Sequence, residues 1–387
     1  MRLLICAGGT GGGVYPALAV LQAIKDNAEV LWIGGEGGME TKLVERSGIP
    51  FRTIPAAGVH GIGLRTLPRN LWQVGRGVLA SRRILREFKP DVLFFTGGYV
   101  AVPMALAGWK VPSLLYVPDI EPGLALNTLA RFADKIAITA EDSLRYFTNT
   151  RGTHAGKNAD RITLTGYPVR ANLARWTRQE ARKELNLSEE GPILLVLGGS
   201  KGARSINTAV LANLPSLVEA AQIIHITGEL DWPNVEEKAK DLFNDDLQRS
   251  TIAGIPTIQS ARYHAYPYLH ELMGAALAAA DLALSRAGAS TLGEYPLFGL
   301  PAVLVPYPHA WRYQKVNADY LVRHAAAVLL EDENLSDQLL PTIKDLLNQP
   351  NKLASMRAAM QQLAHPQAAI QIGRQLLALC PEEEKRP

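Results

Sequence analysis

The chain has 387 residues, of which 47% are hydrophobic, and carries a formal net charge of +3. This length allows a large core in two or three domains, and so small a charge does not indicate nucleic-acid binding. The two cysteines, Cys6 and Cys380, cannot form a disulfide framework or a four-ligand metal site, which favours a reducing cytoplasm. No apolar run approaches the ~20 residues needed to span a bilayer, and the N-terminus enters a strand without a charged leader. We therefore expect a soluble protein or one that sits on a membrane surface.

The first 55 residues alternate between strand and helix patterns. Strands are predicted at 3–7, 29–34 and 51–54, with helices from about Tyr15 to Lys25 and through 39–47. Such alternation is typical of a parallel, doubly wound α/β sheet. The glycine-rich run 8–13 lets the backbone approach a ligand closely. It lacks the Lys-Ser/Thr of a P-loop, and its glycines do not follow the dinucleotide fingerprint.

The segment 62–89 is basic and amphipathic. Its basic residues, interleaved with Trp72 and leucines, are Arg65, Arg69, Arg76, Arg82, Arg83, Arg86 and Lys89. With Trp and Leu on the face opposite the arginines, this segment could lie in the headgroup layer of an anionic membrane. A core-packed helix with a solvated basic face would give the same pattern, so both interpretations stay open.

Further strands are predicted at 91–96, 113–117 and 136–139. The first runs into a second glycine turn at Gly97-Gly98-Tyr99, and the next ends in a loop that contains Asp119 and Glu121. A carboxylate at a strand end beside two glycine turns could serve as a general base. The alternative is that both acids belong to an ordinary proline-flanked turn.

The second half of the chain restarts the pattern of the first. After a hinge at 166–170, a strand at 193–197 meets a glycine loop that contains Ser200, and a helix begins near Ser205. Two doubly wound domains with glycine loops facing one another across a cleft describe the GT-B architecture of nucleotide-sugar glycosyltransferases. We expect an N-terminal domain at 1–165 and a C-terminal domain at 166–365. A helix within 366–387 is expected to pack back toward the N-terminal domain, followed by a short tail.

The stretch 285–317 joins two apolar strands to polar turns. A small-residue turn follows the first strand, Ser290 opens a short helix that carries Glu294, and Gln314 and Asn317 follow the second strand. Free N–H groups at a helix start bind anions, and ligands bind at the carboxyl ends of parallel strands. The stretch therefore suits a nucleotide-linked sugar, with amides for the diphosphate, Glu294 for the ribose and the side-chain amides for the sugar. The alternative is an ordinary βα unit with polar loop residues.

The order and spacing of several motifs resemble the MurG family of bacterial glycosyltransferases over nearly the whole chain. These motifs are GGTGGGVYPALAV at 8–20, GGEGGMETKLV at 34–44, GIPF at 48–51, KPDV at 89–92, GGYVAVP at 97–103, PGL and LARFAD within 122–134, GYPVR at 166–170, GGSKGARSIN at 198–207, and SRAGASTLGE with GLPAVLVPYPHA at 285–310. The family transfers N-acetylglucosamine from UDP-N-acetylglucosamine to the undecaprenyl-linked muramyl-pentapeptide precursor of peptidoglycan. The resemblance implies the same donor, or a related UDP-sugar, and a polyprenyl-linked acceptor. It also implies a peripheral enzyme on an anionic membrane surface, at the cytoplasmic face of the cell membrane, with no nucleic-acid partner and no cofactor.

The resemblance also implies roles for individual residues. The C-terminal domain would bind the nucleotide-sugar and the N-terminal domain the acceptor and the membrane. On the donor side, the diphosphate would be held by Ser200, Gly288, Ala289 and Ser290, the ribose by Glu294, the uracil by Tyr268 and Leu269, and the sugar by Gln314, with Arg170 at the donor side of the cleft. On the acceptor side we expect Thr10, Gly11, Gly12, Gly13, Gly98 and Tyr99.

The chain departs from the family where the acceptor and base are expected. Gly13 stands where the family has histidine, and Tyr116-Val117-Pro118-Asp119 replaces a His-Glu-Gln-Asn motif. We expect direct displacement with inversion at the anomeric carbon and no metal, because the sequence has no Asp-x-Asp. Asp119 is the first candidate base, ahead of Glu121 and His60. The segment 251–270 is longer than the family's. Alternatives are a GT-B transferase for another acceptor or UDP-sugar, and a non-catalytic relative that binds a nucleotide-sugar.

Overall fold

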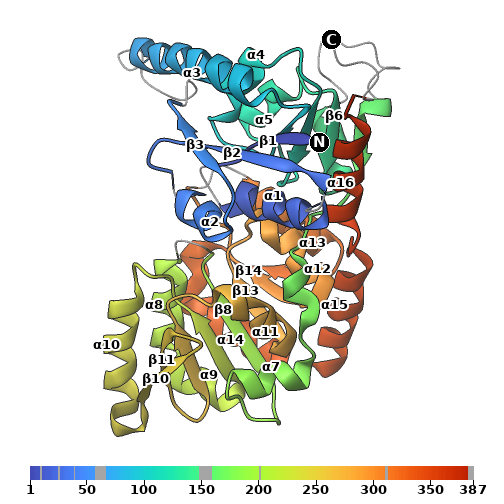
Figure 1. The fold of residues 1–387 in the computed structure, drawn as a ribbon. Coiled ribbons are helices and arrows are strands. Elements are labelled where there is room, and N and C mark those ends of the chain that lie inside the picture. The colour runs from blue at the N-terminus through green and yellow to red at the C-terminus, as the bar shows by residue number, and fades with distance from the viewer. Residues whose placement is uncertain are drawn as a thin grey trace. The chain divides into compact units, whose positions relative to one another are not determined.

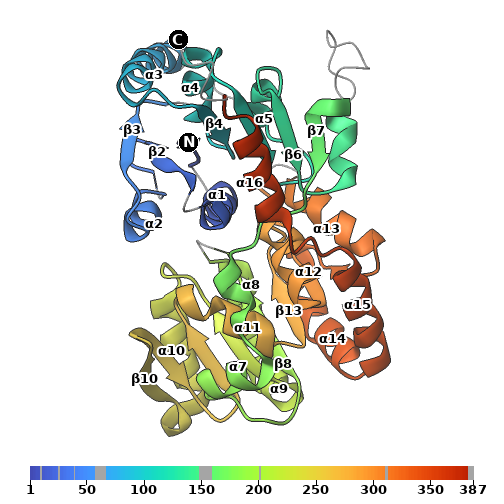
Figure 2. The same ribbon diagram turned by 45° about the vertical axis from the view of Figure 1, so that its right-hand side comes forward.

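The computed structural model describes residues 1–8, 11–24, 27–38, 40–56, 67–147, 159–199, 202–309 and 313–381. The chain divides into two compact units, of which unit 1 comprises Met1–Arg170 with His365–Pro387 and unit 2 comprises Ala171–Ala364. Each unit is a twisted sheet with helices on both faces (Figures 1 and 2). The predicted fold class, α/β with two doubly wound Rossmann-like domains, is confirmed. No helix within the described residues is long and apolar enough to cross a membrane.

The described strands of unit 1 form a seven-stranded parallel sheet in the order β3-β2-β1-β4-β5-β6-β7. They are β1 (Arg2–Cys6), β2 (Glu29–Gly35), β3 (Phe51–Ile54), β4 (Val92–Phe95), β5 (Ser113–Val117), β6 (Lys135–Ile138) and β7 (Ile162–Leu164). The central strands β4 and β5 are buried at every position, as expected when helices cover both faces of a parallel sheet. Strand order reverses between β1 and β4, and in open α/β sheets ligands bind at that switch point.

The helices of unit 1 connect these strands. They are α1 (Gly11–Ile24), α2 (Glu40–Arg46), α3 (Leu67–Phe88), α4 (Ala101–Ala107), α5 (Leu124–Leu129) and α16 (Ala368–Ala378), with short 3-10 helices η2 (Glu141–Tyr146) and η3 (Ala159–Arg161). α1 begins at Gly11 and not near Tyr15 as the sequence suggests, so three glycines form its first turn. α16, from the end of the chain, packs on α1, where Gly373 leaves room for Ile24.

α3 packs on unit 1 with only part of its surface. Gly77, Ser81 and Ile84 are buried at spacings of four and three, and Gly77 lies so close to the Pro55 carbonyl that no side chain would fit. Trp72 and Leu79 are 69% and 67% exposed. They lie seven residues apart on the face that also carries Arg69 and Arg76, which corrects the expectation that tryptophan and leucine face away from the arginines.

The described strands of unit 2 form an eight-stranded sheet in the order β10-β11-β12-β9-β8-β13-β14-β15. They are β8 (Ile193–Leu197), β9 (Gln222–Ile226), β10 (Gln248–Ile252), β11 (Ile255–Gln259), β12 (Tyr263–Tyr266), β13 (Leu282–Ser285), β14 (Ala302–Leu304) and β15 (Ala327–Leu329). β12, β9, β8, β13, β14 and β15 are parallel, whereas β10 and β11 form an antiparallel hairpin at the edge. The long segment 251–270 is therefore ordered as a hairpin and a strand that extend the sheet.

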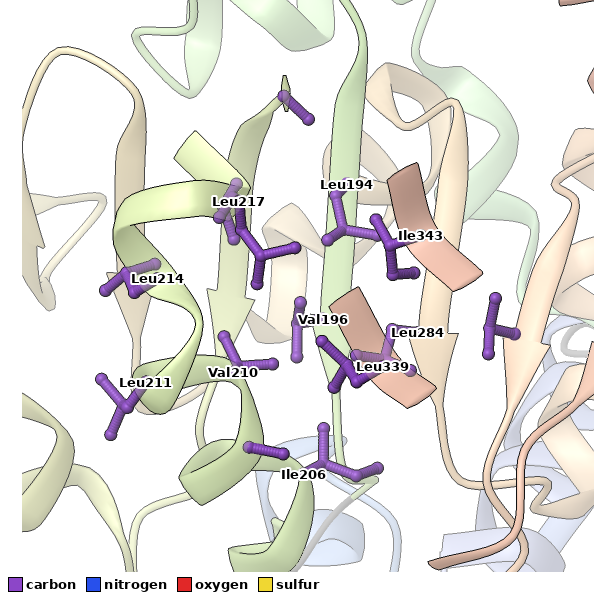
Figure 3. Close-up of a cluster of buried hydrophobic side chains, with 14 of the residues drawn as sticks. Leu194, Val196, Ile206, Val210, Leu211, Leu214, Leu217, Leu284, Leu339 and Ile343 are labelled. Carbon is purple, nitrogen blue, oxygen red and sulfur yellow. The ribbon is translucent and has the colours of Figure 1, made fainter. Parts of the chain in front are cut away.

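The helices of unit 2 enclose its core. They are α7 (Arg178–Glu184), α8 (Arg204–Ala212), α9 (Leu214–Ala220), α10 (Trp232–Phe243), α11 (Met273–Ala279), α12 (Glu294–Phe298), α13 (Tyr313–Arg323), α14 (Leu335–Leu347) and α15 (Pro350–Gln362), with short 3-10 helices η4 (Ala171–Arg175), η5 (Asn244–Asp246), η6 (His270–Leu272), η7 (Ala289–Leu292) and η8 (Asp332–Asn334). Figure 3 shows Leu194 and Val196 of β8 facing α14 through Leu339 and Ile343. This apolar packing fixes the positions of the strand ends.

Candidate active site

Two glycine turns of unit 1 meet at its topological switch point. Gly98, with a φ of +86°, follows β4, and a Cβ there would lie 2.7 Å from the Gly8 carbonyl oxygen after β1. Thr96 Oγ1 donates to the Gly13 carbonyl at 2.7 Å. The predicted acceptor residues Gly11, Gly12, Gly13, Gly98 and Tyr99 therefore come from two neighbouring strand ends, with Tyr99 54% exposed. Thr10 lies outside the described residues.

The two candidate bases follow β5, the next strand of the sheet. Glu121 is 7% exposed and accepts a hydrogen bond from Tyr146 Oη at 3.4 Å, whereas Asp119 is half-buried. Burial raises the pKa of Tyr116 well above its ordinary value, and the negative charge of Asp119 adds to that shift. Asp119 therefore lies near the end of β5 and is the more accessible of the two acids. His60 lies outside the described residues.

A buried carboxylate braces the same edge of unit 1, and sequence reasoning missed it. Glu40 at the start of α2 is 1% exposed, and its Oε1 accepts from the Gly35 N–H at 2.9 Å. It lies against Gly8, Gly34 and Gly38. A Cβ at Gly8 or Gly38 would collide with the carboxylate, whereas a Cβ at Gly34 would collide first with the Phe51 ring. The spacing of glycines in GGEGGME was the available signal, since those glycines make room for this side chain.

The first glycine turn of unit 2 joins β8 to α8. Gly199 and Gly202 have φ of +84° and +75°, and the Gly202 N–H donates to the Gly199 carbonyl at 3.0 Å. Gly202 lies directly on the Thr227 carbonyl after β9, so a side chain there would collide with backbone. The turn thus presents the first N–H groups of α8 at the carboxyl end of the sheet, as an anion site requires. Ser200 lies outside the described residues.

The second turn of unit 2 joins β13 to α12. Ser290 belongs to the 3-10 helix η7, and α12 begins only at Glu294, which corrects the prediction that one short helix spans both. A Cβ at Gly288 would meet nothing within 4 Å, so open space adjoins this backbone. Glu294 is half-buried at the first residue of α12, while Ala289 is buried and Ser290 is half-buried.

Arg286 connects this turn to three other segments, and the sequence analysis gave it no role. Only 9% exposed, its guanidinium donates to the carbonyls of Val305 and Pro306, to Asp332 and, at 2.7 Å, to Ser205 Oγ. It also lies 5.2 Å from the Tyr307 ring centroid. Arg286 thus ties the start of α8 to the end of β14.

The two amides of α13 also hold the strand ends. Asn317 is fully buried and donates to the Ala287 carbonyl at 3.2 Å. This buried position contradicts the expectation that Asn317 contacts the sugar, because the side chain is committed to the turn after β13. Gln314 is half-buried, and its Oε1 accepts from the Tyr307 N–H at 2.9 Å, which leaves Nε2 as the donor that can reach a ligand.

The remaining predicted donor residues lie in different places. Tyr268 is half-buried with its ring 4.3 Å from that of His270, and Leu269 is buried just beyond β12. Arg170 falls in unit 1, where its guanidinium lies 4.6 Å from the Tyr15 ring centroid and its Nε has no hydrogen-bond partner among the described residues. The described residues contain no cluster of three or more His, Cys, Asp or Glu side chains able to hold a metal.

Comparison with known proteins identifies the family. The model of the glycosyltransferase family 28 N-terminal domain matches residues 3–138, and the model of its C-terminal domain matches residues 193–372. A protein of Roseiflexus sp. (strain RS-1) is 39% identical, over 95% of this chain and 93% of its own length. The chain belongs to glycosyltransferase family 28. The predicted resemblance is thereby confirmed, and the protein is a glycosyltransferase.

Other relatives and structures agree with this assignment. The Roseiflexus protein and a Desulforamulus reducens protein, the latter 36% identical over 99% of this chain and 100% of its own, are both named UDP-N-acetylglucosamine–N-acetylmuramyl-(pentapeptide) pyrophosphoryl-undecaprenol N-acetylglucosamine transferase. The crystal structure of Acinetobacter baumannii MurG superposes with a TM-score of 0.71 at 24% identity, covering 97% of this chain and 99% of that one. The structure of UDP-GlcNAc 2-epimerase from Neisseria meningitidis superposes with a TM-score of 0.66 at 14% identity, covering 98% and 100%. At these identities the structures show the shared GT-B fold.

Proposed function

We propose that this family 28 enzyme transfers N-acetylglucosamine, with inversion, from UDP-N-acetylglucosamine to the undecaprenyl-linked muramyl-pentapeptide precursor of peptidoglycan. The observation that carries the proposal is the near full-length identity of 36–39% to relatives named for that reaction. Unit 2 is the nucleotide-sugar-binding half, and unit 1 is the acceptor-binding and membrane-facing half.

The strand ends of unit 2 suit a nucleotide diphosphate. The amides after Gly198 and around Gly288 are the diphosphate donors, because both turns bring free backbone N–H groups to the carboxyl end of a parallel strand. Glu294 adjoins the second turn as the acceptor for the ribose hydroxyls. Gln314 Nε2 is the donor to the sugar, since Tyr307 already occupies its oxygen. Arg170, Ser200, Tyr268 and Leu269 complete the proposed donor set.

The reaction needs a base on the acceptor and a stabilised leaving group. The acceptor hydroxyl oxygen attacks the anomeric carbon while the bond to the β-phosphate oxygen breaks, and UDP leaves with that electron pair. The acceptor proton passes to the Asp119 carboxylate, which is half-buried at the end of β5. Backbone N–H groups and helix dipoles of unit 2 stabilise the negative charge that develops on UDP. Glu121, bonded to Tyr146, is the second candidate.

Unit 1 also carries the surface that we propose to contact the cytoplasmic face of the membrane. We call it the α3 outer face, and it comprises Arg69, Trp72, Arg76 and Leu79. Two large apolar side chains flanked by arginines match an interfacial helix, in which the rings enter the headgroup layer and the guanidinium groups pair with anionic lipids. Trp109, 69% exposed just after the neighbouring α4, adds a further interfacial side chain.

A transfer assay tests the proposed function. The purified chain is mixed with radiolabelled UDP-N-acetylglucosamine and the lipid-linked acceptor, and label in the extracted lipid is measured over time. Transfer with an inverted product supports the proposal. Calorimetric titration with UDP, UDP-N-acetylglucosamine and UDP-glucose then reports donor choice. Tight UDP-sugar binding without transfer to this acceptor would instead point to another acceptor or to a non-catalytic relative.

A further inference from the structure

A polar cavity of about 270 Å³ lies in unit 2, apart from the strand ends that carry the glycine turns. The β10–β11 hairpin, the residues before β12 and Asn186 after α7 enclose it. Ser260 and Ala261 precede β12 at its amino end, whereas Gly198 follows β8 at its carboxyl end, and β8, β9 and β12 are parallel. The cavity therefore faces away from the proposed donor residues. It is built partly on the segment 251–270, which the sequence predicts to be longer than in the family.

The floor of this cavity contains buried polar atoms without partners. His264 and Gln259 are register partners on β12 and β11. Both ring nitrogens of His264, and Oε1 of Gln259, are shielded from solvent and have no hydrogen-bond partner among the described residues. His264 is 3% exposed, and burial lowers its pKa to about 4, so the ring is neutral at pH 7 with one donor and one acceptor nitrogen. An occupant that displaces the atoms covering these groups would donate to and accept from them, and would recover the free energy lost by leaving them unpaired.

The rim of the cavity indicates the chemistry of that occupant. Asn186, Gln248 and the Asp246 carboxylate are exposed around it, with Ser260 between rim and floor. Amides, a hydroxyl and a neutral imidazole each donate and accept, as hydroxyl groups do. Among the described residues, the lining contains no lysine or arginine and one carboxylate, which disfavours phosphates and nucleotides. The volume also falls below the roughly 300–1,000 Å³ of pockets for drug-sized ligands.

We propose that this cavity binds a small uncharged polyhydroxyl molecule of monosaccharide size. The wall that carries Asn186 is braced for such a role. Arg182 donates to the carbonyls of Ser188 and Glu189 at 2.8 and 2.6 Å, and Gln222 accepts from the Ser188 N–H at 2.7 Å. The loop after α7 is therefore held in place by bonds that do not involve the side-chain amide of Asn186 at the rim. The proposal stands on the cavity alone and does not depend on the donor or acceptor of the transfer reaction.

Saturation-transfer NMR on the full chain tests the site with free glucose and free N-acetylglucosamine as probes. Excess UDP is added to occupy the donor site. We expect at least one sugar to give a signal that UDP does not remove. Ala261→Trp, which fills the exposed mouth, and His264→Leu, which removes the floor partners, should each weaken binding by about tenfold, equivalent to about 1.4 kcal/mol. His324→Leu, at an exposed position just after α13, is the matched control and should keep the signal.

The possible results distinguish a sugar bound in this cavity from a sugar bound in the donor site or elsewhere, and from ordered water. Loss of the signal on adding UDP would assign it to the donor site and overturn the proposal. A signal that persists in Ala261→Trp would mean binding elsewhere on the surface. Absence of signal from both sugars would leave ordered water as the occupant, the usual partner of buried polar groups, and would also overturn it. Because Ala261 is exposed, its variant keeps the test decisive if His264→Leu folds poorly.

Discussion

The strand ends of unit 2 are tied together by two buried polar side chains that reach distant segments, whereas those of unit 1 combine close contact between glycine turns with a threonine hydroxyl and a buried carboxylate. In unit 2, Arg286 and Asn317 cross-link the turns after β13 and β14. In unit 1, Gly98 lies against Gly8, Thr96 Oγ1 donates to the Gly13 carbonyl, and Glu40 accepts from the Gly35 N–H. This difference fits the proposed division of labour. A nucleotide diphosphate needs amides preorganised in one geometry, whereas the close backbone packing of unit 1 restricts which side chains positions such as 13 and 98 can carry.

The largest expected effect is on the acceptor side. Asp119→Asn should lower transfer to the lipid-linked acceptor by roughly 10²- to 10⁴-fold, the usual contribution of a general base, with little change in UDP affinity. Steady-state transfer kinetics and UDP calorimetry measure the two quantities. Glu121→Gln tests the second candidate base and should leave turnover nearly unchanged, because that acid is buried and bonded to Tyr146. Unchanged turnover in Asp119→Asn would show that another group is the base.

Restoring the family histidine sharpens the same test. A Cβ at Gly13 would lie 3.1 Å from the Thr96 carbonyl oxygen, so Gly13→His requires β4's end to shift by a few tenths of an ångström. We expect the variant to fold, because this shift is small. We also expect it to restore part of the turnover of Asp119→Asn, because Thr96 follows β4, the strand next to β5. If Gly13→His folds and restores nothing, an imidazole at this position does not reach the acceptor hydroxyl.

Removing the unit 2 cross-link should destabilise that unit. Arg286→Met removes the charged donor to Asp332, which keeps the bond from Ser205 Oγ, and removes the donor to two carbonyls. We expect the free energy of unfolding to fall by about 3 kcal/mol. That value is the low end of the stability loss expected when one partner of a buried ion pair is removed, because Asp332 keeps some contact with water. Urea unfolding followed by circular dichroism measures the loss. Arg204→Met, an 83% exposed arginine at 3.6 Å from Asp231, is the control and should cost under about 1 kcal/mol.

Buried histidines should make unit 2 more acid-sensitive than unit 1. Burial lowers the pKa of His225 from 6.5 to about 3, so between those values the unfolded chain binds a proton that the folded chain does not. Stability is thus complete above pH 6.5 and falls with decreasing pH by about 1.4 kcal/mol per unit for this group. His264, with its pKa lowered to about 4, adds a similar slope. In unit 1 the described histidine, His365, is exposed, although partial burial of its ring also lowers its pKa.

Urea unfolding at pH 4.5 to 7 measures this slope. His225→Asn should reduce the slope by about half over that range, whatever its effect on absolute stability. His324→Asn, at an exposed position just after α13, should leave it unchanged. An unaltered slope in His225→Asn would mean that carboxylates dominate the acid response.

The ribose contact has a smaller expected effect. Glu294→Ala should weaken UDP binding by about 1 to 3 kcal/mol, the usual loss for a hydrogen bond to a charged group. Calorimetry with UDP and with UMP measures it, and Glu219→Ala, at an exposed position of α9, is the control. Equal affinity for UDP in parent and Glu294→Ala would remove Glu294 from the ribose site.

The sequence predicted the features that depend on local pattern. Alternating strands and helices predicted two doubly wound sheets, and glycines after strands predicted the close turns at Gly98 and Gly202. The features it missed depend on contacts between distant positions. Arg286 meets Asp332 and Ser205 across 46 and 81 residues, and no local pattern predicts such a contact. The burial of Asn317 likewise depends on a carbonyl 30 residues away.

The smallest expected effect is on membrane binding, and the structure changes how it is tested. Trp72 and Leu79 are seven residues apart and share a face with Arg69 and Arg76, a grouping that helical periodicity alone could have predicted. Arg69→Gln with Arg76→Gln should weaken sedimentation with anionic vesicles by about 1 kcal/mol per charge, and added salt should weaken it further. Trp72→Ala should weaken it without changing the salt dependence, because it removes apolar contact and not charge. Lys238→Gln, at an exposed position of α10 in unit 2, is the control. Binding that is indifferent to the three substitutions on α3 would mean that α3 is only a packed helix with a solvated basic face. The acceptor would then reach unit 1 by another surface.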